Sequence, residues 1–231
     1  MSFSRAANNP APDMDFTSRM AALLGAFRRE RNGAVADSMR LYGKPYGLNY
    51  GVSLPTLRTL ARAEGTDHEF ARYLYQQDVR CLRLAAFHIA DPARFLPAEF
   101  AFWGGGLLNS ELAEEAAFAL LSRSEAFSAL FEAWTAPGAP CLEQYAALMA
   151  AARAPHPSPA WIAPTVEAVR RAASDNAPAA RLLAQGAVAL LAAAGSLNDE
   201  NRLAVLRAAG SLDSSPAAEY LRDELGWRLD A

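Results

Sequence analysis

Residues 101–115, AFWGGGLLNSELAEE, combine side chains that could bind or transform a ligand. Trp103 precedes three glycines, and Asn109 stands just before an acidic, alanine-rich run. Three glycines can cradle a phosphate, but a phosphate loop of that type also needs a Lys-Ser or Lys-Thr pair and a preceding strand. Here two leucines follow the glycines and a helix is expected before them. The glycines are therefore predicted to end one helix, with Asn109 or Ser110 capping the next.

Other reactive side chains have simpler interpretations. His88 follows Cys81 by seven residues, so both could lie on one helix face, but two ligands do not make a zinc site. We expect His88 to be a hydrogen-bonded core residue, and Cys81 and Cys141 to be buried, reduced thiols. Glu114 and Glu115 point in different directions on a helix, which favours a solvated acidic face over acid/base catalysis. No metal and no other cofactor is expected.

Pairs of arginines at helical spacing could hold phosphates through forked, charge-assisted hydrogen bonds. These arginines are Arg58, Arg62, Arg80 and Arg83. Taken alone, they are better explained as an ordinary surface paired with nearby carboxylates. The stretch before them, residues 40–62, is less ordinary because it carries three tyrosines, among them Tyr50, beside two of the arginines. Its alternative interpretations are a packed interhelical connection and an aromatic, basic rim beside a nucleic-acid groove.

The net charge of −3 is unevenly distributed along the chain. Residues 1–94 hold 13 Arg and Lys against 9 Asp and Glu, a balance of +4, whereas residues 95–231 hold 9 against 16, a balance of −7. A uniform basic coat for nucleic acid is therefore excluded. A basic face confined to the first half of the chain is still possible.

The elements that would position these side chains are predicted to be helices throughout. Strand-type alternation and hairpin turns are nearly missing, and apolar residues recur at helical spacing from end to end. About eleven or twelve helices are expected, with helix pairs beginning near residues 53, 78, 109, 140 and 177. Ser53 and Asp67 are predicted to cap two of these helices, and Asp78 is expected to open the next one. Such a repeat predicts an all-α superhelix of HEAT-like or ARM type, with a compact helical bundle as the alternative.

One helical repeat domain is expected over residues 15–231, after a disordered tail at residues 1–14. That N-terminal stretch lacks the apolar core of a signal peptide, and the apolar run AVALLAAAG ends after nine residues. The sequence therefore predicts a cytoplasmic protein that does not span a membrane.

Three segments in this order resemble the AlkD-type DNA alkylation repair family. They are YGVSLPTLRTLAR at 50–62, DVRCLRLAAFHI at 78–89, and Trp103 ahead of LLNSELAEEAAFALL. The resemblance covers about residues 40–122 and implies a HEAT-like solenoid that holds duplex DNA on a concave basic face. It also implies an N-glycosylase that excises N3- and N7-alkylated purines without a metal. In such chemistry a tryptophan stabilises positive charge, and a carboxylate stabilises the oxocarbenium-like sugar.

The family's site residues carry over unevenly. Trp103 matches the aromatic position, whereas the family's aspartate falls on or next to Asn109. An amide cannot offer a full negative charge to an oxocarbenium ion, and Glu111, the nearest carboxylate, is out of register. The departure weakens the catalytic inference and leaves the fold inference intact.

Two further family positions lie later in the chain. The family's arginine is expected where Gln144 and Tyr145 stand, with Arg153 at the far end of the same helix. The later tryptophan is expected within residues 177–194, which contain none. We therefore expect a DNA alkylation repair-like protein whose glycosylase activity is in question. The alternative is a non-catalytic HEAT-repeat scaffold that binds a protein or peptide on its concave face.

The resemblance and the arginine pattern together give the predicted contacts. Trp103, Asn109 and Tyr50 would contact the substrate, and Arg58, Arg62, Arg80 and Arg83 would hold the DNA backbone.

Overall fold

The structure of the protein is a computed structural model that describes residues 15–42, 46–175 and 177–229. Within these residues it contains thirteen α-helices and four short 3-10 helices, and its one β contact is a single parallel bridge between Leu48 and Val79. The predicted all-α fold is confirmed. The tail predicted at residues 1–14 lies outside the described residues.

The helices follow one another with short connections. The α-helices are α1 (Phe16–Arg29), α2 (Gly33–Leu41), α3 (Leu54–Ala63), α4 (His68–Tyr75), α5 (Arg80–Ile89), α6 (Phe100–Gly105), α7 (Ser110–Ala119), α8 (Phe127–Thr135), α9 (Cys141–Ala151), α10 (Ile162–Asp175), α11 (Ala177–Gly195), α12 (Asp199–Gly210) and α13 (Pro216–Leu229). The 3-10 helices are η1 (Pro92–Arg94), η2 (Pro97–Glu99), η3 (Leu121–Arg123) and η4 (Pro159–Trp161). The count exceeds the expected eleven or twelve because short helices such as α6 are too brief to show an apolar period.

Several helix starts lie where the sequence predicted them. Ser53 accepts a hydrogen bond from Thr56 N at the start of α3, and Asp67 accepts one from Phe70 N at the start of α4. Asn109 caps α7 by accepting from Leu112 N, so the glycines before it do end a helix and release the chain into a turn. These bonds satisfy backbone N–H groups that have no partner inside their own helix.

The start of α5 differs from the prediction. Asp78 was expected to open this helix, but its Oδ1 accepts from Gly47 N at 3.1 Å instead. The first residue of α5, Arg80, donates its backbone N–H to Leu48 O at 2.9 Å. The segment before α3 therefore accepts the backbone hydrogen bond at the start of α5, and this bond holds the N-terminal end of α5 in place.

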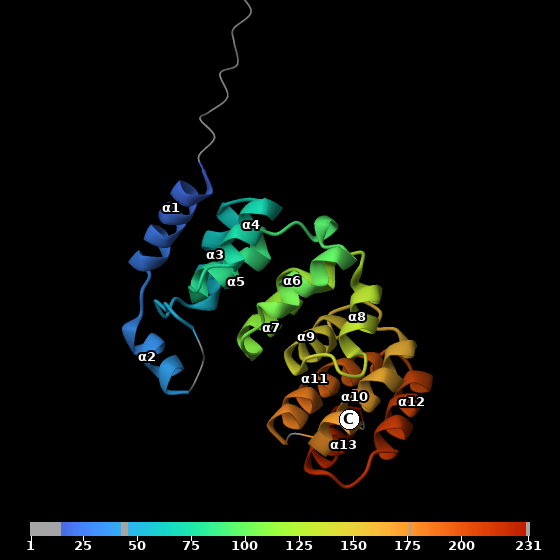
Figure 1. Cartoon of the computed structure of the whole chain (residues 1–231). Coiled ribbons are helices and arrows are strands. Elements are labelled where there is room, and N and C mark those ends of the chain that lie inside the picture. The colour runs from blue at the N-terminus through green and yellow to red at the C-terminus, as the bar shows by residue number, and fades with distance from the viewer. Residues whose placement is uncertain (1–14, 43–45, 176, 230–231) are drawn as a thin grey trace, which may run out of the picture.

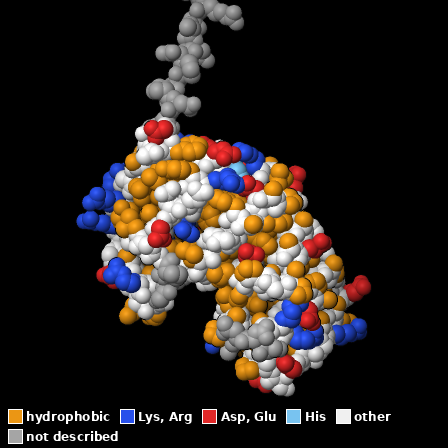
Figure 2. Space-filling view, in the orientation of Figure 1, with side chains coloured by type: hydrophobic (Ala, Val, Ile, Leu, Met, Phe, Trp, Pro, Cys, Tyr) orange, Lys and Arg blue, Asp and Glu red, His pale blue; other side chains and the backbone are white. Residues whose placement is uncertain are grey.

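Alternate helices pack in two rows, as in a HEAT-like superhelix. Helices α3, α5, α7, α9, α11 and α13 contact one another in succession and form the first row, while α4, α8, α10 and α12 pack behind them. The first row faces the hollow of a bent body, with α2 and α13 on opposite sides of the opening (Figure 1). The hollow stays open when side chains are drawn (Figure 2). Because the helices of the first row run in the same direction, their N-terminal ends meet along one edge and their C-terminal ends along the other.

Helix α11 is long and apolar for a structural reason. Pro178–Gly195 would suffice in length and composition to cross a membrane, yet 61% of this window is buried inside the fold. It packs against α9, α10, α12 and α13, so its neighbours cover most of its circumference. A helix that is hydrophobic on most sides is expected at the centre of a helical stack.

Gly51 lies in the turn that leads into α3, and substituting it tests whether this turn requires glycine. Its φ is +67°, and a Cβ placed there would lie 2.0 Å from the backbone oxygen of Asn32. A Gly51→Ala variant should lose more than about 2 kcal/mol of unfolding free energy, because backbone strain and a backbone clash add together. Urea unfolding followed by circular dichroism measures the loss.

Gly65 provides the matched control. Its φ is +75°, but a Cβ there meets nothing within 4 Å. Gly65→Ala should therefore cost only the strain, about 1–2 kcal/mol. Equal losses for the two variants would show that the contact with Asn32 is unimportant.

Candidate nucleic-acid interface

Trp103 is a core residue. Its side chain is 1% exposed, its indole N–H donates to Glu99 Oε2 at 2.9 Å, and its ring packs 4.8 Å from the ring of Tyr75. Its backbone oxygen accepts from the Tyr75 hydroxyl at 2.7 Å. No sugar or base could reach this ring without opening the core, so the structure does not place Trp103 where the predicted substrate contact requires it.

Asn109 lies in a separate polar cluster at the N-terminal edge of the first row. Its Oδ1 accepts from Leu112 N and from the Tyr46 hydroxyl, both at 3.1 Å. The Tyr46 hydroxyl also lies 2.6 Å from Glu111 Oε2, and burial together with this carboxylate raises the pKa of Tyr46. The cluster is held by its own members, and Trp103 points elsewhere. The structure therefore does not bring Trp103 and Asn109 together.

Arg80 neutralises Glu111, the carboxylate nearest to Asn109 in the sequence. Its Nε and Nη2 donate to the two carboxylate oxygens of Glu111 at 2.9 and 2.6 Å, and its Nη1 donates to Val52 O at 2.8 Å. Arg80 is 1% exposed. This placement corrects the expectation that Arg80 holds a phosphate, because the guanidinium is buried and its three nitrogens all bond within the protein.

The remaining predicted contacts are spread out. Arg83 donates to the backbone oxygens of Gln77 and Gly106, so it ties the ends of α4 and α6 together. Tyr50 is half-buried and packs against the core. At the expected arginine position, Gln144 bonds to Ala139 O. None of these side chains points to a common centre with Trp103.

Glu115 is buried, which corrects its expected place on a solvated acidic face. It is 2% exposed and receives a bidentate hydrogen bond from Arg58, with Nε to Oε1 at 2.8 Å and Nη2 to Oε2 at 2.7 Å. The Nε2 atom of His88 lies 2.5 Å from Glu115 Oε1, which confirms His88 as a hydrogen-bonded core residue. Glu114, in contrast, is exposed and accepts from the Tyr145 hydroxyl at 2.8 Å.

The C-terminal edge of the first row carries an aromatic ring surrounded by arginines. Phe118 is 38% exposed, the Cζ atom of Arg58 lies 4.5 Å from its ring centroid, and that of Arg153 lies 6.0 Å away. Arg62 and Arg123 line a concavity that Phe118 also lines. We call these five residues, Arg58, Arg62, Phe118, Arg123 and Arg153, the Phe118 patch.

The Phe118 patch has an excess of positive charge. Four guanidiniums face one carboxylate, Glu115, which is paired with Arg58, so the balance of these groups is +3. Arg62, Arg123 and Arg153 are exposed and form no ion pair with any described carboxylate. Arg123 and Arg153 donate only to backbone oxygens, those of Ala119 and Met149. Arginine in a last helical turn also stabilises the helix dipole, which offers a purely structural explanation.

Positive charge also gathers at a second place. Arg28, Arg29 and Arg31 are exposed at and just after the C-terminal end of α1. Lys and Arg side chains gather there at the outer edge of the molecule, and on the face drawn they do not form a band along the hollow (Figure 2).

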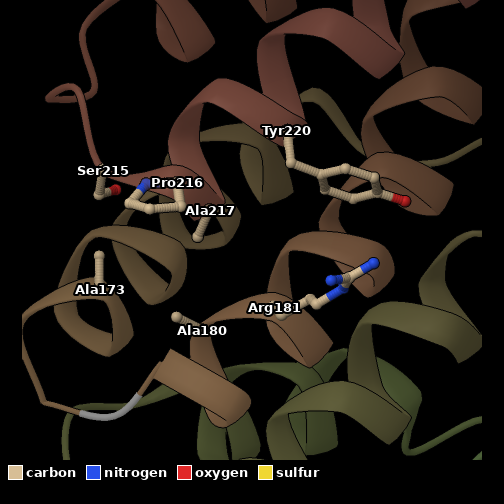
Figure 3. A pocket seen from close by; sticks show the side chains of 7 residues that line it. All are labelled: Ala173, Ala180, Arg181, Ser215, Pro216, Ala217 and Tyr220. Atoms are coloured by element: carbon tan, nitrogen blue, oxygen red, sulfur yellow. The ribbon is translucent and has the colours of Figure 1, made fainter.

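Another concavity lies between α10, α11 and α13 and has a volume of about 360 Å³. Arg181 and Tyr220 extend toward one side of it, and the rest of the wall is made mainly of small side chains (Figure 3). A single exposed cation and an apolar wall give it little to bind an anion with. The Phe118 patch is therefore the stronger candidate for a polyanionic ligand.

Neither cysteine is a good candidate for a nucleophile at the Phe118 patch or at the concavity between α10, α11 and α13. Both are free, and burial raises the pKa of the Cys81 thiol to about 12 and raises that of Cys141 as well. Among the described residues, no three His, Cys, Asp or Glu side chains come together in a way that could hold a metal ion.

The sequence predicts only part of this patch. Arg58 and Arg62 are among the predicted backbone contacts, whereas Phe118 and Arg123 are not. Arg153 is expected only at the far end of the helix that should carry a family arginine. One feature of the sequence indicates this helix face. Glu111, Glu115 and Phe118 follow the i, i+4, i+7 spacing of a single helix face, which an alanine-rich helix would otherwise fill with small residues.

Comparisons with known proteins support the fold. No family model and no curated protein sequence matches the chain. A solved structure described as "A new family of proteins related to the HEAT-like repeat DNA glycosylases with affinity for branched DNA structures" is similar, with a TM-score of 0.70. The two chains are 18% identical, and the match covers 94% of this chain and 96% of the other. At this identity the similarity establishes a HEAT-like helical fold.

The Glu115 cluster predicts how stability depends on pH. Burial alone would raise the pKa of Glu115, but hydrogen bonds from Arg58 and His88 outweigh it and lower the pKa to about 2. A carboxylate with a lowered pKa stabilises the fold above about pH 4.5 and loses that contribution as the pH falls toward 2. Glu115 should account for about 3 kcal/mol of the unfolding free energy that the wild type loses across this window, and Glu115→Gln should lack that part of the loss.

Glu114→Gln is the control for this measurement, since Glu114 is exposed and adjacent to Glu115. It should keep the slope of the wild type in urea unfolding at pH 2.5 to 5. If Glu115→Gln lost stability as steeply as the wild type, the cluster would not control the acid response.

Proposed function

We propose that this protein binds DNA through the phosphate backbone and does not excise bases. The observation that supports the proposal is the Phe118 patch, where four guanidiniums from three first-row helices and their turns surround one exposed aromatic ring. Arginine forks match phosphate oxygens, and phosphate contacts provide most of the sequence-independent affinity for DNA.

The patch suits DNA better than an acidic peptide because it combines charge with an aromatic surface. Arg58 is held by Glu115 and stands over Phe118, so its position is fixed before a ligand arrives. Arg62, Arg123 and Arg153 form no ion pair with a described carboxylate, so binding a phosphate would break no existing pair. A pre-positioned set of cations with one exposed ring fits a strand whose phosphates bind arginine and whose bases stack where they are accessible.

Base excision of the type implied by the resemblance lacks its main groups. A glycosidic cleavage needs a carboxylate near the sugar and benefits from an aromatic face beside it. Here Glu111 is paired with Arg80, Asn109 is neutral, and Trp103 is in the core. Trp103 and Asn109, the two positions that the resemblance assigns to the chemistry, both take part in packing and hydrogen bonding within the protein.

The similar solved structure guides the choice of DNA. It is described as a protein with affinity for branched DNA structures. We extend this property to the present chain as part of the proposal, because a branch exposes unstacked bases and brings phosphates close together. A protein with a curved body and a compact cationic patch is suited to such a substrate.

Salt dependence tests the proposal. With three unpaired arginines on phosphates, the logarithm of the association constant should fall with the logarithm of salt concentration with a slope of about −3. Arg62→Ala or Arg123→Ala should reduce that slope by about 1 and weaken binding to duplex and branched DNA by about tenfold. Fluorescence anisotropy at several salt concentrations provides both values.

Arg207→Ala is the matched control, because Arg207 is also an exposed arginine and lies on α12, remote from the patch. It should bind as the wild type does. A flat salt response, or equal losses from Arg207→Ala and Arg62→Ala, would contradict the proposal. It would then favour the non-catalytic scaffold that binds a protein or peptide.

A second assay tests the absence of catalysis. Methylated DNA incubated with an excess of the protein should release no 3-methyladenine or 7-methylguanine above a buffer control, measured by chromatography. Asn109→Asp should also stay inactive, since the new carboxylate would face Tyr46 rather than a bound sugar. Release by the wild type that is lost in Glu111→Gln would show that this carboxylate is catalytic after all.

A further inference from the structure

The concavity beside Phe118 is an open pocket at the C-terminal edge of the first row. It lies between the C-terminal ends of α3, α5 and α7 and has a volume of about 470 Å³. Arg62 enters from the end of α3 and Arg123 from the turn after α7, while His88 of α5 lies between them. Two exposed guanidiniums therefore reach one pocket from separate elements.

The lining of this pocket contains no carboxylate. His88 is already bonded to Glu115, and Phe118 with Ala119 gives an apolar wall. Thr66 and Gly65 line the side nearest α4, and the Thr66 hydroxyl makes no hydrogen bond to any described residue. The pocket lining thus combines two forked cations, a free hydroxyl and an exposed aromatic ring.

This combination suits a terminal phosphate better than an internal one. An internal phosphodiester carries a single negative charge and has only two free oxygens that can accept hydrogen bonds from the arginines. A phosphomonoester carries up to two charges and presents three acceptor oxygens, which two arginine forks and a hydroxyl can satisfy. The base next to it could stack on Phe118, as bases do on exposed aromatic rings.

We propose that this pocket binds the phosphomonoester at the end of a DNA strand, with Arg62 and Arg123 on the phosphate and Phe118 against the terminal base. The inference rests on the proposed DNA binding and makes it specific: the protein recognises phosphorylated strand ends, such as those at a nick, gap or broken branch. Arg58 and Arg153 hold the adjoining strand.

The experiment compares three fluorescently labelled duplexes that share one sequence. One strand end carries a 5′-phosphate, a 3′-phosphate or only hydroxyl groups. The wild type should bind at least one phosphorylated end about tenfold more tightly than the hydroxyl end in anisotropy titrations at one fixed salt concentration. The 5′ and 3′ arms identify which end enters the pocket.

Substitutions locate the preference. Arg62→Ala and Arg123→Ala should bring the ratio of affinities for phosphorylated and hydroxyl ends close to one, while Arg207→Ala should retain the wild-type ratio. Arg62→Lys should lower the ratio partly, because it keeps the charge and loses the fork. Since Arg62 and Arg123 are exposed, their variants should unfold in urea at the wild-type midpoint.

The outcomes separate the two claims. Equal binding of all three duplexes by the wild type would overturn this inference and leave the proposed DNA binding intact. A ratio that survives in both alanine variants would also overturn it, since the preference would then arise elsewhere. If no duplex were bound at any salt concentration, the proposed function itself would fail, and this inference with it.

Discussion

Two Arg–Glu pairs that join α7 to its neighbours are the constraint on which the first row depends. Glu111 is paired with Arg80 of α5, and Glu115 with Arg58 of α3. Arg80, Glu115 and His88 are almost completely buried, so losing one partner would leave a buried charge without compensation. Breaking such a pair typically costs about 3–5 kcal/mol. These pairs fix how α3, α5 and α7 lie against one another.

The same pairs determine which end of the row is available to a ligand. At the N-terminal edge, the carboxylate of Glu111 and the buried guanidinium of Arg80 neutralise each other. About one turn further along α7, Glu115 uses only two nitrogens of Arg58, and beyond it no described carboxylate balances the arginines around Phe118. The face of α7 therefore changes from neutral to cationic over roughly 10 Å. Binding is expected at the cationic end.

Fold and site differ in how far the sequence predicts them. Helical periodicity and the caps at Ser53, Asp67 and Asn109 predict the elements and the two-row stack, because these signals are local. The roles of the arginines depend on which helix lies opposite each one. Arg80 and Arg62 look alike in sequence, yet one is paired and buried and the other exposed. The family resemblance predicted a site near Trp103, but the Trp103 ring packs against Tyr75 in the core.

The most direct test is a structure of the protein bound to a short duplex with a phosphorylated nick. The account predicts phosphate oxygens within hydrogen-bond distance of the guanidiniums of Arg62 and Arg123, with Trp103 still packed against Tyr75. DNA seated over Asn109, with Trp103 turned out of the core toward a deoxyribose and Glu111 released from Arg80, would contradict it.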